Sequence, residues 1–222
     1  KLKTLLITKQ MGGQMVWSSD VENYTGFSML SGADLTLKFE EHLKSITEDL
    51  EIKEGAEVVN IERNIITFEV EIKEGGLVYA KAVIIASGKE PRHLGIPGEE
   101  TFYGKGVAVC ATCDAPLYKN KDVAVVGGGN SAMDALLALS KVARRIYSVN
   151  VNGQLVGDAV LKAKIESSPA ITFYNTTKTL EGQGEKGVTG LVVKKTGSAP
   201  ETLPVSGIFV EIGYSPSNSF DR

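Results

Sequence analysis

The sequence predicts an α/β fold, and three observations within one segment lead to that prediction. A short apolar run is followed by a glycine-rich turn, the turn by a helical pattern of alanines and leucines, and the helix by a second apolar run. The parts are a strand at 122–126, a turn at 127–129, a helix at 130–142 and a strand at 145–149. This order is that of a βαβ unit.

The remaining elements alternate in the same manner on both sides of this unit. Before it, we expect strands at 3–8, 56–62, 65–72, 77–80 and 82–86, a glycine loop at 11–14 and a helix at 31–50. After it, we expect a helix at 159–167 and strands at 171–174, 190–194 and 208–212. Prolines and glycines between 89 and 100 break the pattern, and they predict entry into a second domain near Pro91 and Arg92.

Composition excludes several classes of protein. The chain has 222 residues, of which 42% are hydrophobic and 23% are charged, and its net charge is −3. This balance is ordinary for a soluble globular protein and gives no sign of a nucleic-acid surface or a membrane anchor. No apolar run approaches the roughly 18 residues that a membrane span needs. The 2 cysteines are too few for the disulfide framework of a secreted domain, so we expect a cytoplasmic protein.

The glycine turn has the small residues that a dinucleotide site requires. Gly127, Gly129 and Ala132 fit the pattern G-x-G-x-x-A. Gly127 would make the bend, Gly129 would leave room for a pyrophosphate, and Ala132 would let helix and strand pack closely. Asn130 or Ser131 would cap the helix. The alternative is a turn that packs and binds nothing. The candidate contacts are Gly127, Gly128, Gly129, Asn130, Ser131 and Ala132.

Nucleotide preference should be set about 20 residues further on, at the end of the second strand. Asn150 stands there, without an acid to bind a ribose 2′-hydroxyl or an arginine to bind a 2′-phosphate. Arg144 and Arg145 lie at the opposite end of the strand. We expect Asn150 to hydrogen-bond the ribose, which favours NADH over NADPH. Loss of nucleotide binding is a third alternative.

Cys110 and Cys113 form a C-x-x-C pair, the smallest unit that can cycle between dithiol and disulfide. Two other readings compete with a redox pair. A zinc site would need His42 and His93 as further ligands, and neither has metal-ligand spacing. Two inert, packed thiols are the other alternative. Asp114 could carry protons during thiol exchange, or it could be an ordinary surface acid in a turn.

Six segments occur in the order and spacing of a known family. They lie at 12–14, 21–24, 86–88, 110–114, 127–132 and 207–216. Together they resemble the low-molecular-weight thioredoxin reductase family and its relative, the flavoprotein reductase of alkyl hydroperoxide reductase systems. The resemblance covers nearly the whole chain. It implies two Rossmann-like, three-layer β/β/α domains that bind FAD and NAD(P), with the flavin domain interrupted by the nucleotide domain.

The resemblance also implies a domain division and an electron path. A partial flavin domain would span 1–91, the pyridine-nucleotide domain 92–205, and the return into the flavin domain 206–222. Electrons would pass from nicotinamide to FAD, to the cysteine pair and then to a thioredoxin-like or peroxiredoxin-system protein disulfide. The full-length form would be a homodimer.

Site residues follow from the resemblance position by position. Cys113 would lie nearest the flavin, Cys110 would attack the partner disulfide, and Asp114 would be the acid/base. The implied flavin contacts are Gly12, Gly13, Gln14 and Asn23, with Ala86, Ser87 and Gly88 near the FAD phosphates. The implied nicotinamide contacts are Ile212, Gly213 and Tyr214.

The chain departs from the family at three places. The family's HRR-type phosphate-binding motif is replaced by Asn150, Val151 and Asn152. The sequence opens at what resembles the second strand of the flavin domain, and it ends before the family's C-terminal Gly-Asp segment. We therefore expect an incomplete flavin domain that binds FAD poorly or not at all. A flavin-free remnant without turnover and a ferredoxin-fed reductase are the alternative functions.

Overall fold

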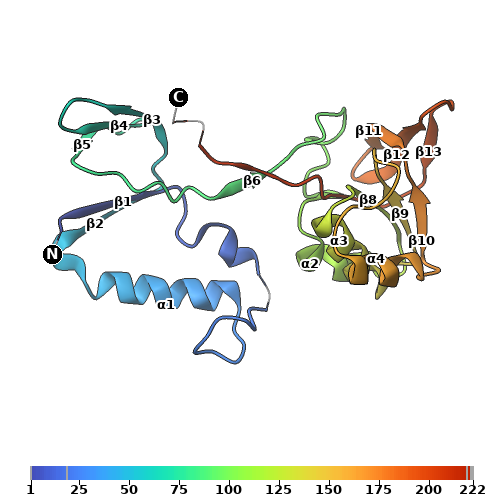
Figure 1. Cartoon of the computed structure of the whole chain (residues 1–222), viewed down its shortest axis with the longest axis horizontal. Helices are drawn as coiled ribbons and strands as arrows, with labels where there is room; N and C mark the ends of the chain where they lie inside the picture. Colours follow the sequence, from blue (N-terminus) through green and yellow to red (C-terminus); the bar gives the residue numbers. More distant parts are fainter. Residues whose placement is uncertain (1, 19, 219, 221–222) are drawn as a thin grey trace. The chain divides into compact units, whose positions relative to one another are not determined.

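The computed structural model describes residues 2–18, 20–218 and 220. The chain forms two compact units, unit 1 with Lys1–Gly88 and Pro216–Arg222 and unit 2 with Lys89–Ser215 (Figure 1). These boundaries differ from the expected ones at 91/92 and 205/206. The later return has a physical reason, because β14 (Gly207–Val210) pairs with two strands of the unit 2 sheet.

Unit 1 begins with a parallel pair of strands joined through a helix. β1 (Thr4–Thr8) pairs with β2 (Leu50–Glu54), and α1 (Gly32–Lys44) lies between them in the sequence. Ser31 caps α1 by accepting the Asp34 N–H at 3.0 Å. The helix expected over 31–50 is therefore six residues too long at its end, because residues from Leu50 onward pair with β1 instead of continuing the helix. Two short 3₁₀ turns complete this part, η1 (Gly13–Trp17) and η2 (Thr47–Asp49).

An antiparallel sheet follows in unit 1. Its strands are β3 (Val58–Arg63), β4 (Phe68–Ile72) and β5 (Gly76–Ala80). The three strands predicted there are confirmed, although the middle one starts later than expected. Ile65 and Ile66 are 100% and 83% exposed, because they lie in the turn between β3 and β4.

The strand predicted over 82–86 is wrong, because these residues have no regular secondary structure. Ile84 is 93% exposed and Ile85 is 50% exposed. An apolar run of this kind is typical of a parallel strand buried on both faces, which requires neighbouring strands. No described strand pairs with residues 82–86.

Unit 2 contains a five-stranded parallel sheet with the order β10-β9-β8-β14-β7. Besides β14, its strands are β7 (Val107–Ala108), β8 (Asp122–Val126), β9 (Arg145–Val149) and β10 (Ile171–Tyr174). The helices of the unit are α2 (Ala111–Asp114), η3 (Ala115–Tyr118), α3 (Asn130–Ser140) and α4 (Ala159–Glu166). The predicted βαβ unit and the α/β fold are confirmed.

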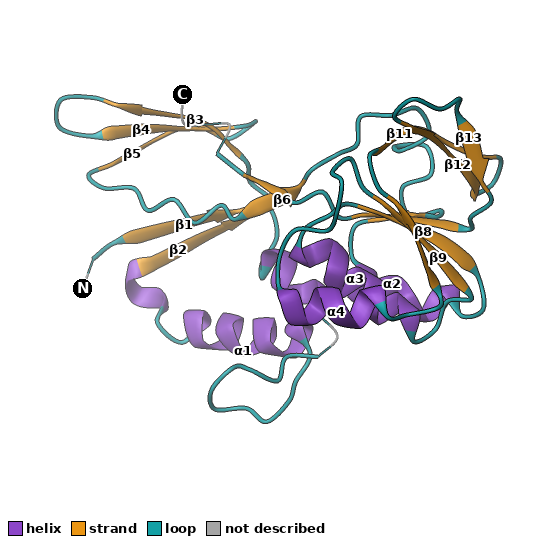
Figure 2. Cartoon of the chain, turned by 45° about the vertical axis from the view of Figure 1, so that its right-hand side comes forward, coloured by secondary structure: helices purple, strands orange, loops and turns teal. Residues whose placement is uncertain are grey.

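The sheet has a different layer on each face (Figure 2). Helices α2, α3 and α4 cover one face, and an antiparallel sheet covers the other. The antiparallel strands are β11 (Thr177–Gly184), β12 (Val188–Lys195) and β13 (Glu201–Leu203). β11 was not predicted, since its sequence TKTLEGQG contains two glycines and few apolar residues. A short pair, β6 (Lys89–Pro91) with β15 (Tyr214–Pro216), completes the described strands.

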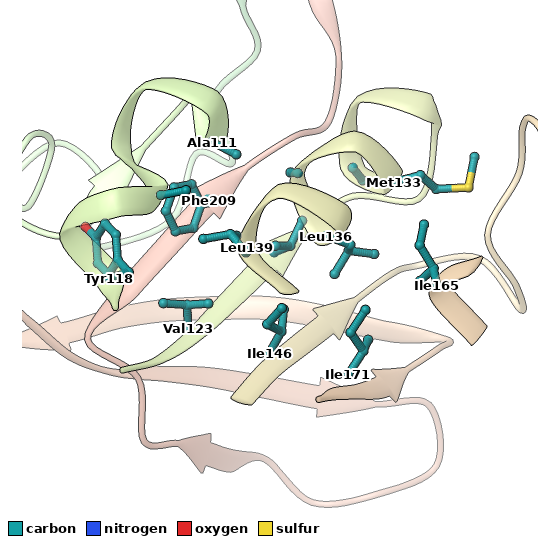
Figure 3. Close-up of a cluster of buried hydrophobic side chains, with 14 of the residues drawn as sticks. Ala111, Tyr118, Val123, Met133, Leu136, Leu139, Ile146, Ile165, Ile171 and Phe209 are labelled. Atoms are coloured by element: carbon teal, nitrogen blue, oxygen red, sulfur yellow. The ribbon is translucent and has the colours of Figure 1, made fainter. Parts of the chain in front are cut away.

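Successive side chains of β8 point to opposite faces of the sheet, and both faces are buried. Val123 and Val125 face the helices, in a core shared with Leu136, Leu139 and Phe209 (Figure 3). Ala124 and Val126 face the opposite core, which contains residues of β12 and β13. A strand buried on both sides reads as a continuous apolar run, as the sequence does here. Among the described residues, no helix is long and apolar enough to cross a membrane.

An ion pair joins the starts of β8 and β9. Arg144 donates from Nε to Asp122 Oδ1 at 2.8 Å and from Nη2 to Oδ2 at 2.9 Å. The Asp122 side chain is only 11% exposed. The hydrogen bonds from Arg144 hold the pKa of the Asp122 carboxyl below its ordinary value, although burial opposes the shift.

We expect Asp122→Asn to lower the free energy of unfolding by about 1 kcal/mol at pH 7, because Arg144 loses its charged partner. A depressed carboxyl pKa stabilises the fold above the unfolded-state pKa, and this stabilisation is lost as pH falls through the folded-state pKa. Urea unfolding at pH 7 and at stepwise lower pH measures the difference between the two proteins. That difference should shrink in acid, whereas Glu185→Gln, an exposed control, should have little effect at any pH.

Candidate functional site

The glycine turn after β8 requires glycine at its first position. Gly127 has a φ of +146°, and a Cβ there would lie 2.1 Å from the Glu211 carbonyl oxygen and 3.2 Å from the Ala132 Cβ. Ala132 is fully buried at the base of α3. The turn is therefore tight because strand β14 and helix α3 both pack against Gly127, as expected from the sequence.

Gly129 is different, because a Cβ there would meet open space. It is the N-cap residue of α3, and no side chain caps the helix. The prediction that Asn130 or Ser131 caps α3 is wrong, because the Asn130 Oδ1 accepts the Asp158 N–H at 3.0 Å instead. The first N–H groups of a helix have no acceptor within it. The start of α3 is thus a backbone cradle to which a phosphate fits.

Asn150 does not have the orientation expected for a ribose ligand. Its side chain is 2% exposed, its Nδ2 donates to the Gln154 carbonyl at 2.8 Å and its Oδ1 accepts the Asn152 N–H at 3.0 Å. A Cβ on Gly128 would lie 2.5 Å from that Oδ1. Asn150 therefore holds the loop after β9 in place directly beside the glycine turn. In this arrangement the amide is used within its own loop, and contact between Asn150 and a ribose stays a prediction.

Two further hydrogen bonds attach the same loop to the turn. The Val156 N–H donates to the Gly128 carbonyl at 2.7 Å, and the Asp158 N–H donates to Asn130. These two hydrogen bonds could not be predicted from the sequence, because every residue other than proline has a backbone N–H donor. They fix the loop after β9 at the edge of the glycine turn.

We expect Asn150→Ala to weaken binding of NADH, because the loop loses both side-chain hydrogen bonds and moves away from the turn. The free energy of unfolding should fall by about 1–3 kcal/mol, the cost of leaving the Gln154 and Asn152 groups without their partner. Asn152→Ala is the matched control, since that side chain is exposed. Titration of NADH by fluorescence and urea unfolding measure the two effects. Equal affinities in all three proteins would show that the loop does not shape the cradle.

Cys110 and Cys113 are bonded to each other. The S–S distance is 2.07 Å, the Cα–Cα distance is 5.4 Å, and the bridge spans the first turn of α2. Cys110 is the N-cap of α2, and its Sγ accepts the Cys113 N–H at 3.3 Å. Both cysteines are half-buried, so neither lies sealed in the core. In this state the pair is not two separate thiols.

The zinc alternative gains no support from the structure. No group of three or more His, Cys, Asp or Glu side chains in the described ranges could hold a metal ion. His93 lies 3.5 Å from a Glu99 carboxylate oxygen, and the carboxylate of Glu99 accepts the N–H groups of Leu94 and Gly95. His42 belongs to α1 in unit 1.

Asp114 follows the disulfide directly and is half-buried. Burial raises the pKa of its carboxyl above the ordinary aspartate value. Nearby Tyr118 is buried against Phe209, with ring centroids 5.0 Å apart. Burial and the charge of Asp114 raise the pKa of the Tyr118 phenol. A carboxyl with a raised pKa takes up a proton more readily than an ordinary aspartate, which suits it to proton transfer.

Glu211 is a residue that sequence reasoning missed. It follows β14, and its carboxyl is half-buried. This carboxyl accepts the N–H of Ala111, the residue directly after Cys110. The pKa of this carboxyl is raised to about 7, chiefly by burial and in smaller part by the charge of Asp134, whereas the Ala111 hydrogen bond opposes the rise. Glu211 lies in the segment 207–216 that resembles the family, but no role was predicted for it, because only the tertiary fold brings its carboxyl to α2.

The residues expected to contact nicotinamide follow Glu211 in unit 2. Ile212 packs against the core on the antiparallel face of the sheet. The Gly213 carbonyl accepts the Arg92 N–H at 2.9 Å, and Lys89 Nζ lies 3.7 Å from the centre of the Tyr214 ring. These contacts fix the segment between β14 and β15.

The residues expected to contact flavin lie in exposed parts of unit 1. Gly12 and Gly13 have φ of +81° and +51°, and a Cβ on Gly12 would lie 2.4 Å from Thr36. The other candidates are Gln14 on η1, Asn23 in the loop that follows, and Ala86, Ser87 and Gly88 in the irregular segment before β6. The exposed residues among them are Asn23, Ala86, Ser87 and Gly88. The described residues of unit 1 therefore do not enclose a flavin by themselves.

Comparison with known proteins agrees with this combination of a glycine cradle and a disulfide. Residues 1–221 match the family described as pyridine nucleotide-disulphide oxidoreductase. The chain belongs to this family. The sequence is 32% identical over 220 residues to a protein of Staphylococcus epidermidis named as an alkyl hydroperoxide reductase subunit, covering 99% of this chain and 43% of that protein.

Two other comparisons point in the same direction. A protein of Bacillus subtilis named NADH dehydrogenase is 31% identical over 221 residues, which cover 99% of this chain and 43% of that protein. The crystal structure of Lactococcus lactis thioredoxin reductase in its FR conformation superposes with a TM-score of 0.80 at 28% identity. That superposition covers 98% of this chain and 72% of the other. The chain thus spans less than half the length of the curated relatives it matches.

Proposed function

We propose that this chain is part of a disulfide reductase that receives electrons from NADH through FAD and passes them on through Cys110 and Cys113. The observation that carries the proposal is the position of the disulfide. Helix α2, which holds it, packs against α3, and α3 begins at the glycine cradle. The family match supports a redox role for this arrangement.

The chemistry of the cysteine pair balances with two electrons and two protons. Reduction breaks the Cys110–Cys113 bond and leaves two thiols. Cys110, as a thiolate, then attacks a disulfide of a partner protein, forms a mixed disulfide and releases one partner thiolate, which takes a proton. Cys113 attacks the mixed disulfide, so the internal bond forms again and the partner leaves fully reduced. Asp114 is our candidate for holding the transferred proton.

We assign the cofactors from the same residues. The backbone of Gly127, Gly128, Gly129, Asn130 and Ser131 would hold the pyrophosphate of NADH, and Ile212, Gly213 and Tyr214 would lie near its nicotinamide. FAD would supply the transfer of electrons between NADH and the disulfide. The S. epidermidis relative supports a peroxiredoxin-linked partner, and the L. lactis structure supports a thioredoxin-like one. A cytoplasmic location and a homodimer are parts of the same proposal.

The test is an anaerobic thiol count. The reductase of which we propose this chain to be part is purified and incubated with FAD and NADH, alone and together, and its free thiols are titrated afterwards. We expect two new thiols per chain with both cofactors and none with FAD alone. NADH binding without any new thiols would instead support the flavin-free binding module. Failure to bind NADH at all would remove the nucleotide from the proposal.

A further inference from the structure

Glu211 lies where the two motifs of unit 2 meet. Its backbone N–H donates to the Val126 carbonyl at 2.8 Å, at the end of the strand that precedes the glycine turn. Its carbonyl oxygen is the atom that a Cβ on Gly127 would strike. Its carboxyl accepts the Ala111 N–H in the first turn of α2. One residue therefore contacts both the nucleotide turn and the helix that holds the disulfide.

Two acceptors share the first turn of α2. The Sγ of Cys110 accepts the Cys113 N–H at 3.3 Å, and the Glu211 carboxyl accepts the Ala111 N–H. Ala111 is bonded directly to Cys110 along the chain, and it is 4% exposed against the core that contains Phe209 (Figure 3). The half-buried Glu211 carboxyl thus meets α2 at the residue that follows Cys110 in the chain.

Among the described residues, the charge that acts on this carboxyl is negative. Asp134 on α3 acts on Glu211 through its charge, and Glu211 in turn acts on the phenol of Tyr214. Asp114 follows Cys113 directly in α2, and Tyr118 lies in η3. An ionised Glu211 would therefore add negative charge where a thiolate must form.

We propose that Glu211 is a positioning residue for the Cys110–Cys113 pair, whose carboxyl anchors the first turn of α2 and whose charge sets how readily the reduced pair forms a thiolate. This inference rests on the proposed redox function of the pair. A thiol becomes reactive by losing a proton to give the thiolate. A neighbouring carboxylate disfavours the second negative charge, whereas the protonated acid does not. Because Glu211 changes its charge near neutral pH, its titration is coupled to that of the thiol.

The experiment uses the 222-residue chain without FAD. Dithiothreitol redox buffers first establish whether the disulfide is reduced and re-formed reversibly. The rate of alkylation of the reduced chain by iodoacetamide is then measured from pH 5 to pH 9, since only the thiolate reacts. The variants are Glu211→Gln, which keeps an acceptor for Ala111 but removes the charge, Asp134→Asn and the exposed control Glu185→Gln.

We expect Glu211→Gln to move the midpoint of the alkylation profile down by about one pH unit and to give a simple, single titration. The wild-type profile should rise less steeply, because Glu211 ionises over the same range. Asp134 is exposed on α3. Because Asp134→Asn removes a charge that raises the Glu211 pKa, Glu211 should ionise at lower pH, and its effect on the alkylation profile should move with it. Circular dichroism shows whether Glu211→Gln folds. If it does not fold, Asp134→Asn still tests the effect of the Glu211 charge. Glu185→Gln should match the wild type.

Two different failures can be told apart. If the wild-type disulfide resists dithiothreitol or does not re-form, the proposed redox function is wrong. If the wild-type pair cycles normally but the profiles of Glu211→Gln and Asp134→Asn coincide with the wild type, Glu211 does not control the thiolate and the inference is overturned.

Discussion

Replacement of Cys113 with serine should abolish reduction of a protein disulfide while leaving reduction of FAD by NADH intact. The second thiol is required to resolve the mixed disulfide, so the partner would remain attached to Cys110. We expect turnover to fall by roughly a thousandfold or more, as is typical when a nucleophile is removed. Turnover is measured on the reductase of which this chain is proposed to be part, with NADH, FAD and an oxidised thioredoxin-like substrate. Flavin reduction is followed by the loss of absorbance near 450 nm, where oxidised flavin absorbs.

Thr112→Ser provides the control for this substitution, because Thr112 is exposed between the two cysteines and changes by one methyl group. It should retain wild-type turnover. Cys110→Ser should also lose turnover, but it should not trap the partner covalently, since Cys110 is the proposed attacking thiol. Trapping by Cys110→Ser and not by Cys113→Ser would exchange the two roles. Partner reduction that survives in both variants would contradict a role for the pair.

Local patterns predicted those parts of unit 2 whose structure depends on nearby residues. The strand at 145–149 and the strand at 171–174 have the predicted ends, and the glycine turn lies between β8 and α3 as expected. The strand predicted at 82–86 is absent, because its formation depends on residues that are distant in sequence. Its apolar run has the right composition, but a parallel strand needs partners that are distant in sequence, and no described segment supplies them.

Side-chain roles were harder to predict than elements. Asn150 stands at the position where a ribose ligand is expected, yet its amide is used within its own loop. Glu211 lies in the segment 207–216 that resembles the family, but its proposed role follows from the contact between its carboxyl and α2. The contacts of Glu211 join segments that are distant in sequence. Those of Asn150 are local, but they depend on the conformation of the loop after β9, which its sequence does not reveal. Asp114 was found because the C-x-x-C pair marks its position.

The two outer glycines of the turn should respond to the same substitution in opposite ways. Gly127→Ala places a methyl group 2.1 Å from the Glu211 carbonyl oxygen, at a φ of +146° that L-residues avoid. The strand or the turn must move, so we expect the free energy of unfolding to fall by about 2–4 kcal/mol. Urea unfolding measures this loss. A stability equal to that of wild type would mean that the turn relaxes without cost.

Gly129→Ala should fold as the wild type does and still bind NADH poorly. Its backbone, with φ −95° and ψ −170°, is extended and open to any residue, and the new methyl group would meet no protein atom. The methyl would instead occupy the space where the pyrophosphate must approach the first N–H groups of α3. We expect a rise of about tenfold or more in the dissociation constant for NADH, equivalent to about 1.4 kcal/mol. Wild-type affinity in this stable variant would show that the phosphates do not lie against Gly129, and the glycine turn would then be a packing feature only.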